Sequence, residues 1–307
     1  MISVVIPAHN EAAVIVRALT AVLAGTGDQS VDVVVACNGC TDGTADVVRA
    51  SGLPVRTVEV PQASKIAALR AADAVAVGFP RIYLDADVVL TGAAAIRLAE
   101  ALDAGPALAG RPPLRYDTTS AGALVRRYYA ARSAVPEVLG SLWGAGVYAV
   151  SAAGHARVTP WPDVLADDLY VDRCFARDEI VVVDADPVVV RVPRTSGDLL
   201  RVLERTYRGK SMEGVGAAGT AYPVGTAGPV GAAGPVGAAG ATGSAEGSAA
   251  RTARGVLRLA VRRPLHLLDA VVYLGFAVLA RVRLRHARNG SDVWERDESS
   301  REPMGPV

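Results

Sequence analysis

Two aspartates one residue apart, Asp85 and Asp87, follow directly after a short apolar run that ends at Leu84. In an extended segment the side chains of residues i and i+2 point to the same side, so we expect both carboxylates to face one site. Carboxylate oxygens are suitable ligands for Mg²⁺ or Mn²⁺, whose other positions go to phosphate and water. A metal held there neutralises charge that builds up on a diphosphate leaving group. The triplet therefore predicts a divalent-metal site for diphosphate chemistry.

The spacing of this triplet is not specific by itself, because Asp-x-Asp sequences are common at turns. A second Asp-Ala-Asp triplet occupies residues 184–186, and we expect it to be a loop before Pro187. The first triplet differs in its position, since it follows a segment predicted to be a buried strand.

A second acidic feature is the pair Asp167 and Asp168, on a helix predicted near residues 163–176. Taken alone, the pair is typical of solvated acids in the first turn of a helix, where the helix dipole favours negative charge. Its chemical meaning therefore depends on what surrounds it.

The segments that would position these residues alternate between strands and helices. Apolar, β-branched runs predict strands at 2–6, 31–36, 55–60, 81–84, 146–150 and 188–192, and helices are predicted from Asn10 to about Leu23, from Thr41 or Asp42, over 65–77 and over about 198–207. Such alternation predicts an α/β protein with a parallel sheet. Ligands of such sheets bind at the carboxyl ends of the strands, where residues 7–11, 38–42 and 85–87 fall.

Composition narrows the class of protein. The chain has 307 residues, is 51% hydrophobic and carries a formal net charge of +1, so no overall field points to nucleic acid. Its three cysteines are too few, and odd in number, for a disulfide framework, which favours a reducing compartment. The first residues lack the basic segment of a secretory signal, so we expect a cytoplasmic protein.

Four segments resemble, in order and rough spacing, the motifs of family 2 glycosyltransferases: Ser3–Glu11, Asn38–Thr44, Lys65–Leu69 and Leu84–Asp87. The resemblance covers about residues 2–210. It implies a GT-A fold, with a Rossmann-like, mostly parallel sheet flanked by helices, here followed by a C-terminal helical segment. It also implies a nucleotide-diphosphate sugar donor and inversion at the anomeric carbon.

The same resemblance assigns roles to residues. Asp85 and Asp87 would hold Mg²⁺ or Mn²⁺, Asp168 aligns with the catalytic base, and Asp167 aligns with the acid before it. The donor would contact residues of all four motifs and two later arginines: Pro7, Ala8, Asn10, Glu11, Asn38, Asp42, Lys65, Asp85, Ala86, Arg205 and Arg208. We therefore expect a transferase that moves one sugar to an acceptor hydroxyl, in cell-envelope glycan or glycolipid synthesis.

Two departures from the family pattern limit this interpretation. Cys37-Asn38 stands where the family commonly has an acidic pair, so the donor base is left open. The aromatic-arginine signature of processive members is absent, which favours addition of a single sugar. Cys37 and Cys40 have a redox or zinc spacing, but only Cys174 remains as a further thiol ligand. Trp143, Tyr148 and Trp161 are candidates for an acceptor platform or for the core.

Other functions remain as alternatives. A nucleotide-sugar-binding or partner-binding protein with no catalytic activity would share the fold. A sugar-nucleotide nucleotidyltransferase would also share it, but needs a Gly-rich, Arg-bearing loop after the first strand. A Rossmann dehydrogenase needs glycines there, and this chain has Pro7-Ala8-His9 instead.

Beyond the transferase domain, predicted over 1–210, the composition changes. Residues 211–250 are rich in Gly, Ala and Pro, with Gly at every third position from Gly225 to Gly243. Collagen needs this period, but the run is short and low in Pro, so we predict a flexible linker. Residues 251–290 are predicted to be a basic amphipathic helical segment, and 291–307 a disordered tail.

A helix is predicted over 264–288, too short in its apolar part to span a bilayer. A polar stripe is expected on one side, opposite an aliphatic face: His266, Asp269, Tyr273, Arg281 and Arg285 against Leu267, Leu268, Val271, Val272, Leu274, Phe276 and Leu279. We expect the aliphatic face to lie either on the inner face of an anionic membrane, which would suit a lipid-linked acceptor, or on the transferase domain or a second subunit.

Overall fold

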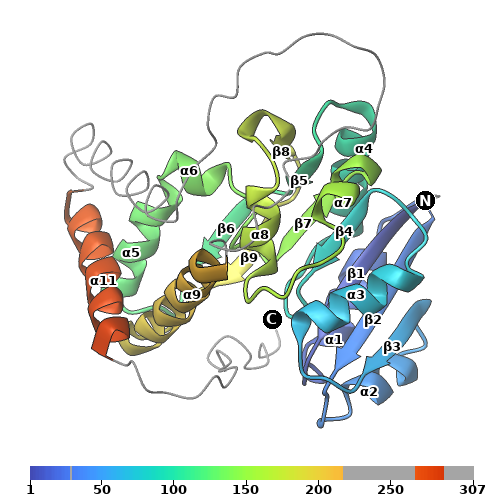
Figure 1. Ribbon diagram of the computed structural model, residues 1–307, viewed down its shortest axis with the longest axis horizontal. Coiled ribbons are helices and arrows are strands. Elements are labelled where there is room, and N and C mark those ends of the chain that lie inside the picture. The colour runs from blue at the N-terminus through green and yellow to red at the C-terminus, as the bar shows by residue number, and fades with distance from the viewer. Residues whose placement is uncertain (28–29, 217–266, 287–307) are drawn as a thin grey trace.

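A computed structural model describes residues 1–27, 30–216 and 267–286 of the chain. At its centre is a seven-stranded sheet with the order β3-β2-β1-β4-β7-β5-β8, and a second sheet pairs β6 with β9. Figure 1 shows helices on both faces of the large sheet, with α5 (Ala123–Ser133), α9 (Ser196–Gly216) and α11 (Leu267–His286) together at one end of the molecule.

In chain order the elements are β1 (Ile2–Ala8), α1 (Ile15–Leu23), β2 (Val31–Asn38), α2 (Thr44–Ala50), β3 (Val55–Val60), α3 (Lys65–Val75), β4 (Arg81–Leu84), α4 (Gly92–Ala104), β5 (Ala109–Arg111), β6 (Leu114–Asp117), α5 (Ala123–Ser133), α6 (Pro136–Leu139), β7 (Val147–Val150), α7 (Ala152–Val158), α8 (Asp167–Arg173), η1 (Arg177–Glu179), β8 (Ile180–Val182), β9 (Val188–Arg191), α9 (Ser196–Gly216) and α11 (Leu267–His286).

The predicted sheet is confirmed. Strands β3, β2, β1 and β4 are mutually parallel. Strand β7 lies antiparallel between β4 and β5, and β5 is parallel to β8. The run predicted as a strand at 188–192 forms β9, which pairs with β6 outside the large sheet. The sheet is therefore mostly parallel, and the carboxyl ends of β1, β2 and β4 meet at one edge.

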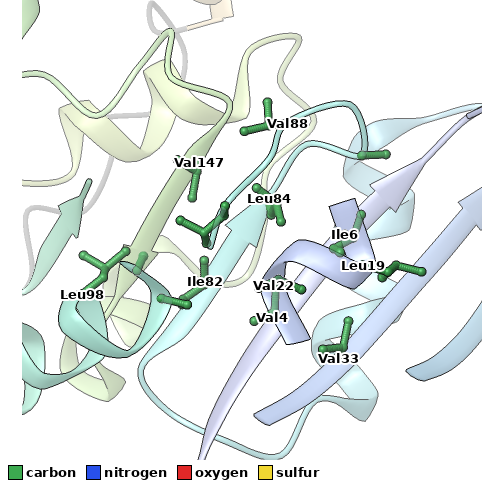
Figure 2. Packing of buried hydrophobic residues seen from close by; sticks show 14 of the residues in the cluster. Val4, Ile6, Leu19, Val22, Val33, Ile82, Leu84, Val88, Leu98 and Val147 are labelled. Atoms are coloured by element: carbon green, nitrogen blue, oxygen red, sulfur yellow. The ribbon is translucent and has the colours of Figure 1, made fainter. Parts of the chain in front are cut away.

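Alternating side chains of the central strands form two separate cores. Val4 and Ile6 of β1 pack with Leu19 of α1 and Leu98 of α4 on one face, as Figure 2 shows. Val5 of β1 points to the other face and joins the cluster that includes α3 and α8. Because β1 is buried on both faces, it is a continuous β-branched run rather than an alternating one.

The predicted start of the first helix is wrong. Helix α1 begins at Ile15, five residues after Asn10, so Asn10 does not cap it. The backbone of Asn10 has a φ of 55°, a left-handed conformation that asparagine tolerates better than most residues. Its side-chain oxygen accepts a hydrogen bond from the backbone N–H of Thr41, at 2.7 Å. The asparagine thus connects the end of β1 to the turn after β2.

Two other helices also differ at their ends. Helix α2 starts at Thr44, after Gly43 with a φ of 78°. Helix α8 starts at Asp167 and is shorter than the 163–176 predicted. Helix α3 begins at Lys65 as predicted, and the hydroxyl of Ser64 caps it by accepting from the backbone N–H of Ala67.

The C-terminal organisation is described in part. Helix α9 continues to Gly216, past the predicted start of the linker at 211. The rest of that linker, the arginine-rich residues before α11 and the tail predicted over 291–307 lie outside the described residues. Within the residues that are described, no helix is both long enough and apolar enough to cross a bilayer.

Helix α11 packs against α5 and α9 (Figure 1), and Asp269 and Tyr273 of the predicted polar stripe are buried in this contact. Tyr273 stacks on Tyr128 with ring centroids 4.8 Å apart, and Asp269 forms an ion pair with Arg127, with 3.0 Å between Oδ1 and Nη1. Phe276 is 8% exposed in the same cluster.

The expected aliphatic face is divided by this packing. Phe276 is buried in the domain and Val272 and Leu274 are partly buried against it, so the domain covers part of that face. The aliphatic side chains that remain exposed are Leu267, Leu268, Val271, Val278, Leu279 and Val282.

This orientation predicts unequal effects of truncating side chains of α11. Phe276→Ala should lower the free energy of unfolding by about 3–5 kcal/mol, because a packed ring leaves a cavity. Val278→Ala, at a side chain 58% exposed, should change it by less than about 0.5 kcal/mol. Urea unfolding of the full-length chain measures both. A larger loss in Val278→Ala than in Phe276→Ala would mean that the helix is turned the other way.

Candidate active site

Lys65 joins two acidic segments that are distant in the sequence. Its Nζ lies 2.7 Å from Oδ1 of Asp85, at the end of β4, and 2.7 Å from Oδ1 of Asp167, at the start of α8. Burial alone would lower the pKa of the lysine, but the two carboxylates raise it above its usual range. Lys65 is therefore a permanent cation at the centre of the site, rather than an ordinary exposed residue of the first helical turn.

The two metal-motif aspartates do not lie in an extended segment. A backbone hydrogen bond from Val88 N to Asp85 O, at 3.0 Å, closes a turn after β4. The predicted reason for their facing one way, the alternation of a strand, is therefore wrong. Both side chains are part-exposed, and the carboxylate of Asp87 acts on the pKa of Asp85, so the turn still brings them together.

A glycine loop before β7 lies against both acidic segments. The backbone N–H of Asp85 donates to the carbonyl of Gly146 at 2.8 Å. A side-chain carbon at Gly146 would lie 2.5 Å from Cγ2 of Val88 and 3.2 Å from Oδ2 of Asp85. Gly144 donates its N–H to Oδ2 of Asp168 at 2.8 Å. The loop thus holds Asp85 through Gly146 and Asp168 through Gly144.

Asp167 has both carboxylate oxygens occupied by the protein. Oδ1 is paired with Lys65, and Oδ2 accepts a hydrogen bond from the hydroxyl of Tyr148 at 2.8 Å. The residue is 4% exposed. Asp167 is therefore placed to hold Lys65 rather than to take a proton from a substrate.

Asp168 is part-exposed and differs from its neighbour in its partners. Its two oxygens accept backbone N–H groups of Gly144 and Leu169, at 2.8 and 2.7 Å, which leaves each oxygen a further lone pair. Burial and the adjacent charge of Asp167 raise the pKa of Asp168 to about 6. At neutral pH the group is mostly ionised and has the basicity that a general base needs.

The residues predicted at the nucleotide end form a connected structure. The backbone N–H of Glu11 donates to Oγ1 of Thr44 at 2.8 Å, and that of Ala12 donates to Oδ2 of Asp42 at 3.1 Å. Burial opposes the ionisation of Asp42, but hydrogen bonds from Thr44 and Ala12 lower its pKa overall. The segment after β1 and the turn after β2 therefore form one wall, and Asn10 contributes to it through Thr41.

Four other predicted donor residues are buried in the protein. Pro7, Ala8 and Ala86 are buried in the protein interior. Asn38 is 1% exposed. With its amide oriented to suit its neighbours, Asn38 donates to the carbonyl of Ala8 at 2.8 Å and accepts from the N–H of Ser64 at 3.2 Å. These side chains shape the wall from behind, and their direct contact with a donor stays a prediction.

The two predicted arginines are not placed at the site by the structure. Arg205 is exposed on α9, a helix that packs against α5 and α11. Arg208 follows on the same helix, and its side chain lies outside the described part. Their roles at a diphosphate remain predictions.

Burial decides between alternatives that the sequence left open for two aromatic residues and a cysteine, whereas the glycine loop was not predicted. Tyr148 and Trp161 are buried in the core, although Tyr148 also holds Asp167. The thiol of Cys37 is buried, which raises its pKa to about 12, and this does not suit redox chemistry. The Gly-x-Gly spacing at 144–146 was a signal that could have indicated the loop.

The fold and the site define a GT-A-type glycosyltransferase, and comparison with known proteins agrees. The model of the family described as glycosyl transferase family 2 matches residues 3–150. The predicted resemblance to this family is thereby confirmed over residues 3–150.

Solved structures show where the fold recurs. The mannosyltransferase PcManGT from Pyrobaculum calidifontis, in complex with GDP-Man and Mn²⁺, has a TM-score of 0.62 and 18% identity, over 94% of this chain and 88% of that one. Glucosyl-3-phosphoglycerate synthase from Mycobacterium tuberculosis, in complex with Mn²⁺, UDP-glucose and phosphoglyceric acid, has a TM-score of 0.47 and 26% identity, over 67% and 79%. No curated protein sequence matches the chain.

The contacts of the acidic pair predict which aspartate is the base. Asp168→Asn should reduce turnover by about two to four orders of magnitude with little change in donor affinity, because the amide cannot accept the proton. In the parent protein the rate should fall below pH 6, as the carboxylate with a pKa of about 6 takes up a proton. A pH series of initial rates measures both. An inactive Asp167→Asn beside an active Asp168→Asn would reverse the assignment.

Proposed function

We propose that this protein is an inverting, metal-dependent glycosyltransferase that moves one sugar from a nucleotide-diphosphate sugar to an acceptor hydroxyl. The observation that carries the proposal is the contact of Lys65 with both Asp85 and Asp167, beside the part-exposed Asp168. This contact supports the proposal, because it joins Asp85, the candidate diphosphate-binding residue, to the acidic pair that includes the candidate base.

The charges of the site fit a divalent cation. Three carboxylates, those of Asp85, Asp167 and Asp168, interact with one ammonium group, that of Lys65, and the carboxylate of Asp87 interacts with Asp85. Burial raises the pKa of Asp85, Lys65 opposes this, and the carboxylates of Asp167 and Asp87 add to it. A site with this excess of negative charge favours a cation.

Asp85 and Asp87 would hold Mg²⁺ or Mn²⁺, which would offset charge on the diphosphate as it leaves. Among the described residues no group of three or more His, Cys, Asp or Glu side chains is arranged as a metal site. The two aspartates would therefore supply part of the coordination, and donor phosphate and water the rest.

In the proposed reaction, Asp168 accepts the proton of the acceptor hydroxyl. The hydroxyl oxygen forms the new bond to the anomeric carbon as the bond to the diphosphate breaks, on the opposite face of the sugar. Asp167 keeps Lys65 in position, and Gly144 orients Asp168 through its backbone N–H. Asp168 thus acts on the acceptor, whereas Asp167 and Gly144 position other residues of the site.

Removing a carboxylate of the metal motif tests the proposal. Asp87→Asn should abolish donor hydrolysis and transfer and weaken Mn²⁺-dependent donor binding, whereas Asp184→Asn, in the second Asp-Ala-Asp triplet, should retain both. Release of nucleoside diphosphate from a panel of nucleotide sugars, with and without EDTA, is the measurement. Activity that survives EDTA would refute metal dependence, and binding without hydrolysis by the parent protein would favour a non-catalytic role.

We also propose that the enzyme works at the inner face of an anionic membrane, in cell-envelope glycan or glycolipid synthesis. Two features support this. The outward face of α11 is aliphatic, with Leu268 51% exposed and Val271 58% exposed. Residues 251–288 carry nine arginines and one acid, although the whole chain carries only +1. Arginines near an anionic surface add about 1 kcal/mol each.

Flotation with vesicles tests the membrane contact. The triple variant Leu268→Ser, Val271→Ser and Leu279→Ser should bind anionic vesicles at least about a hundredfold more weakly than the parent, because about 1 kcal/mol or more is lost with each of the three side chains. A control triple at other exposed valines, Val75→Ser, Val77→Ser and Val182→Ser, should bind like the parent. Equal flotation of both triples, or concentration-dependent dimers lost only in the first, would assign the aliphatic face elsewhere.

A further inference from the structure

A part-buried arginine, Arg132, lies next to the proposed base. It is the last basic residue of α5. Its Nε donates to the hydroxyl of Tyr116 at 2.7 Å, and its guanidinium lies over the ring of Trp143, with the central carbon 4.9 Å from the ring centroid. A side-chain carbon at Gly144 would lie 3.2 Å from Nη2 of the arginine. The guanidinium is therefore held by two aromatic residues, Tyr116 and Trp143, beside the glycine loop.

The charge of Arg132 has no carboxylate to balance it. Over the part of the chain that the structure describes, its hydrogen-bond acceptor is one neutral phenol, and no ion pair includes it. Other arginines of the protein do have such partners: Arg127 of the same helix pairs with Asp269, and Arg81 with Asp73. A guanidinium stays charged in a protein, and removing it from water is unfavourable unless an anion compensates. The terminal nitrogens of Arg132 are thus suited to an anion supplied by a ligand.

The glycine loop indicates which ligand this is. Gly146 contacts Asp85 of the metal motif, whereas Gly144 binds Asp168 through its N–H and has Arg132 against its Cα. Arg132 is therefore at the end of the loop that carries the base, and the metal motif is at the other end. The base must face the acceptor, so an anion at Arg132 belongs to the acceptor rather than to the donor diphosphate.

We propose that Arg132 binds an oxyanion of the acceptor, a phosphate or a carboxylate, close to the hydroxyl that receives the sugar. A guanidinium fork matches the two oxygens of either group. Since only the backbone of Gly144 separates Arg132 from Asp168, the anion and the reacting hydroxyl lie a few bonds apart in the acceptor. This inference rests on the proposed transferase function and adds the chemical class of its acceptor.

Binding without turnover tests the subsite directly. In metal-free full-length protein, inorganic phosphate or acetate should bind about ten- to a hundredfold more weakly to Arg132→Met than to the parent, the usual effect of losing a hydrogen bond to a charged group. Arg126→Met, an exposed arginine of the same helix, is the matched control and should bind like the parent. Arg132→Lys keeps the charge without the fork and should fall between them. Equal affinity in Arg132→Met and the parent would overturn the proposal.

Turnover supplies the second measurement. Hydroxy compounds are offered as the neutral alcohol, the phosphate monoester and the hydroxy acid, and kcat/KM is compared between members of each set. The parent should prefer the anionic members about tenfold or more, and Arg132→Met should lose that preference with an unchanged KM for the donor. A raised donor KM, or an unchanged preference, would remove Arg132 from the acceptor site. If no compound and no donor is turned over, the transferase proposal fails, and phosphate binding alone decides the subsite.

Discussion

The ion-pair bridge formed by Lys65 is the interaction on which the site depends. A cation in the first turn of a helix faces the positive end of the helix dipole, so α3 itself does not favour a lysine there. The carboxylates of Asp85 and Asp167 do, and they hold it at 2.7 Å from each. Asp167 is buried, whereas Lys65 and Asp85 are part-exposed, so removing Lys65 would leave a buried carboxylate without its counter-charge. The bridge therefore ties α3, β4 and α8 together as it sets the charge of the site.

The glycine loop divides this site into two ends. Gly144 and Gly146 have φ values of 82° and 66°, a region that residues other than glycine enter at a cost. Val88 and Asp85 also lie too close to Gly146 to leave room for a side chain there. The loop can thus give one backbone N–H to Asp168 and one carbonyl to Asp85 within three residues. This short stretch of backbone separates the proposed donor end of the site, at Asp85, from the proposed acceptor end, at Asp168. Both aspartates are held by main-chain groups of the loop, which side-chain substitutions leave in place.

The sequence predicted the sheet and the motifs better than their local geometry. The β-branched runs of β1, β2 and β4 are buried on both faces, so their composition indicates parallel strands, and the carboxyl-end rule then assigned residues 7–11, 38–42 and 85–87 to one edge of the sheet. The capping role of Asn10 failed because its side chain bonds to Thr41, a partner 31 residues away. The contact of Lys65 with Asp167 spans an even longer separation, and no local pattern encodes it.

Helix α11 shows the limit of periodicity in another way. A helical period separates two faces but does not say which one a neighbour covers. Here α5 offers Arg127 and Tyr128, which suit Asp269 and Tyr273, so these two residues are buried together with Phe276, and the aliphatic side chains farther round the helix are left outside. The same α5 ends beside the base at Arg132. Helix α5 therefore lies between α11 and the proposed acceptor end of the site, and a partner that binds α11 would rest on the element that carries Arg132.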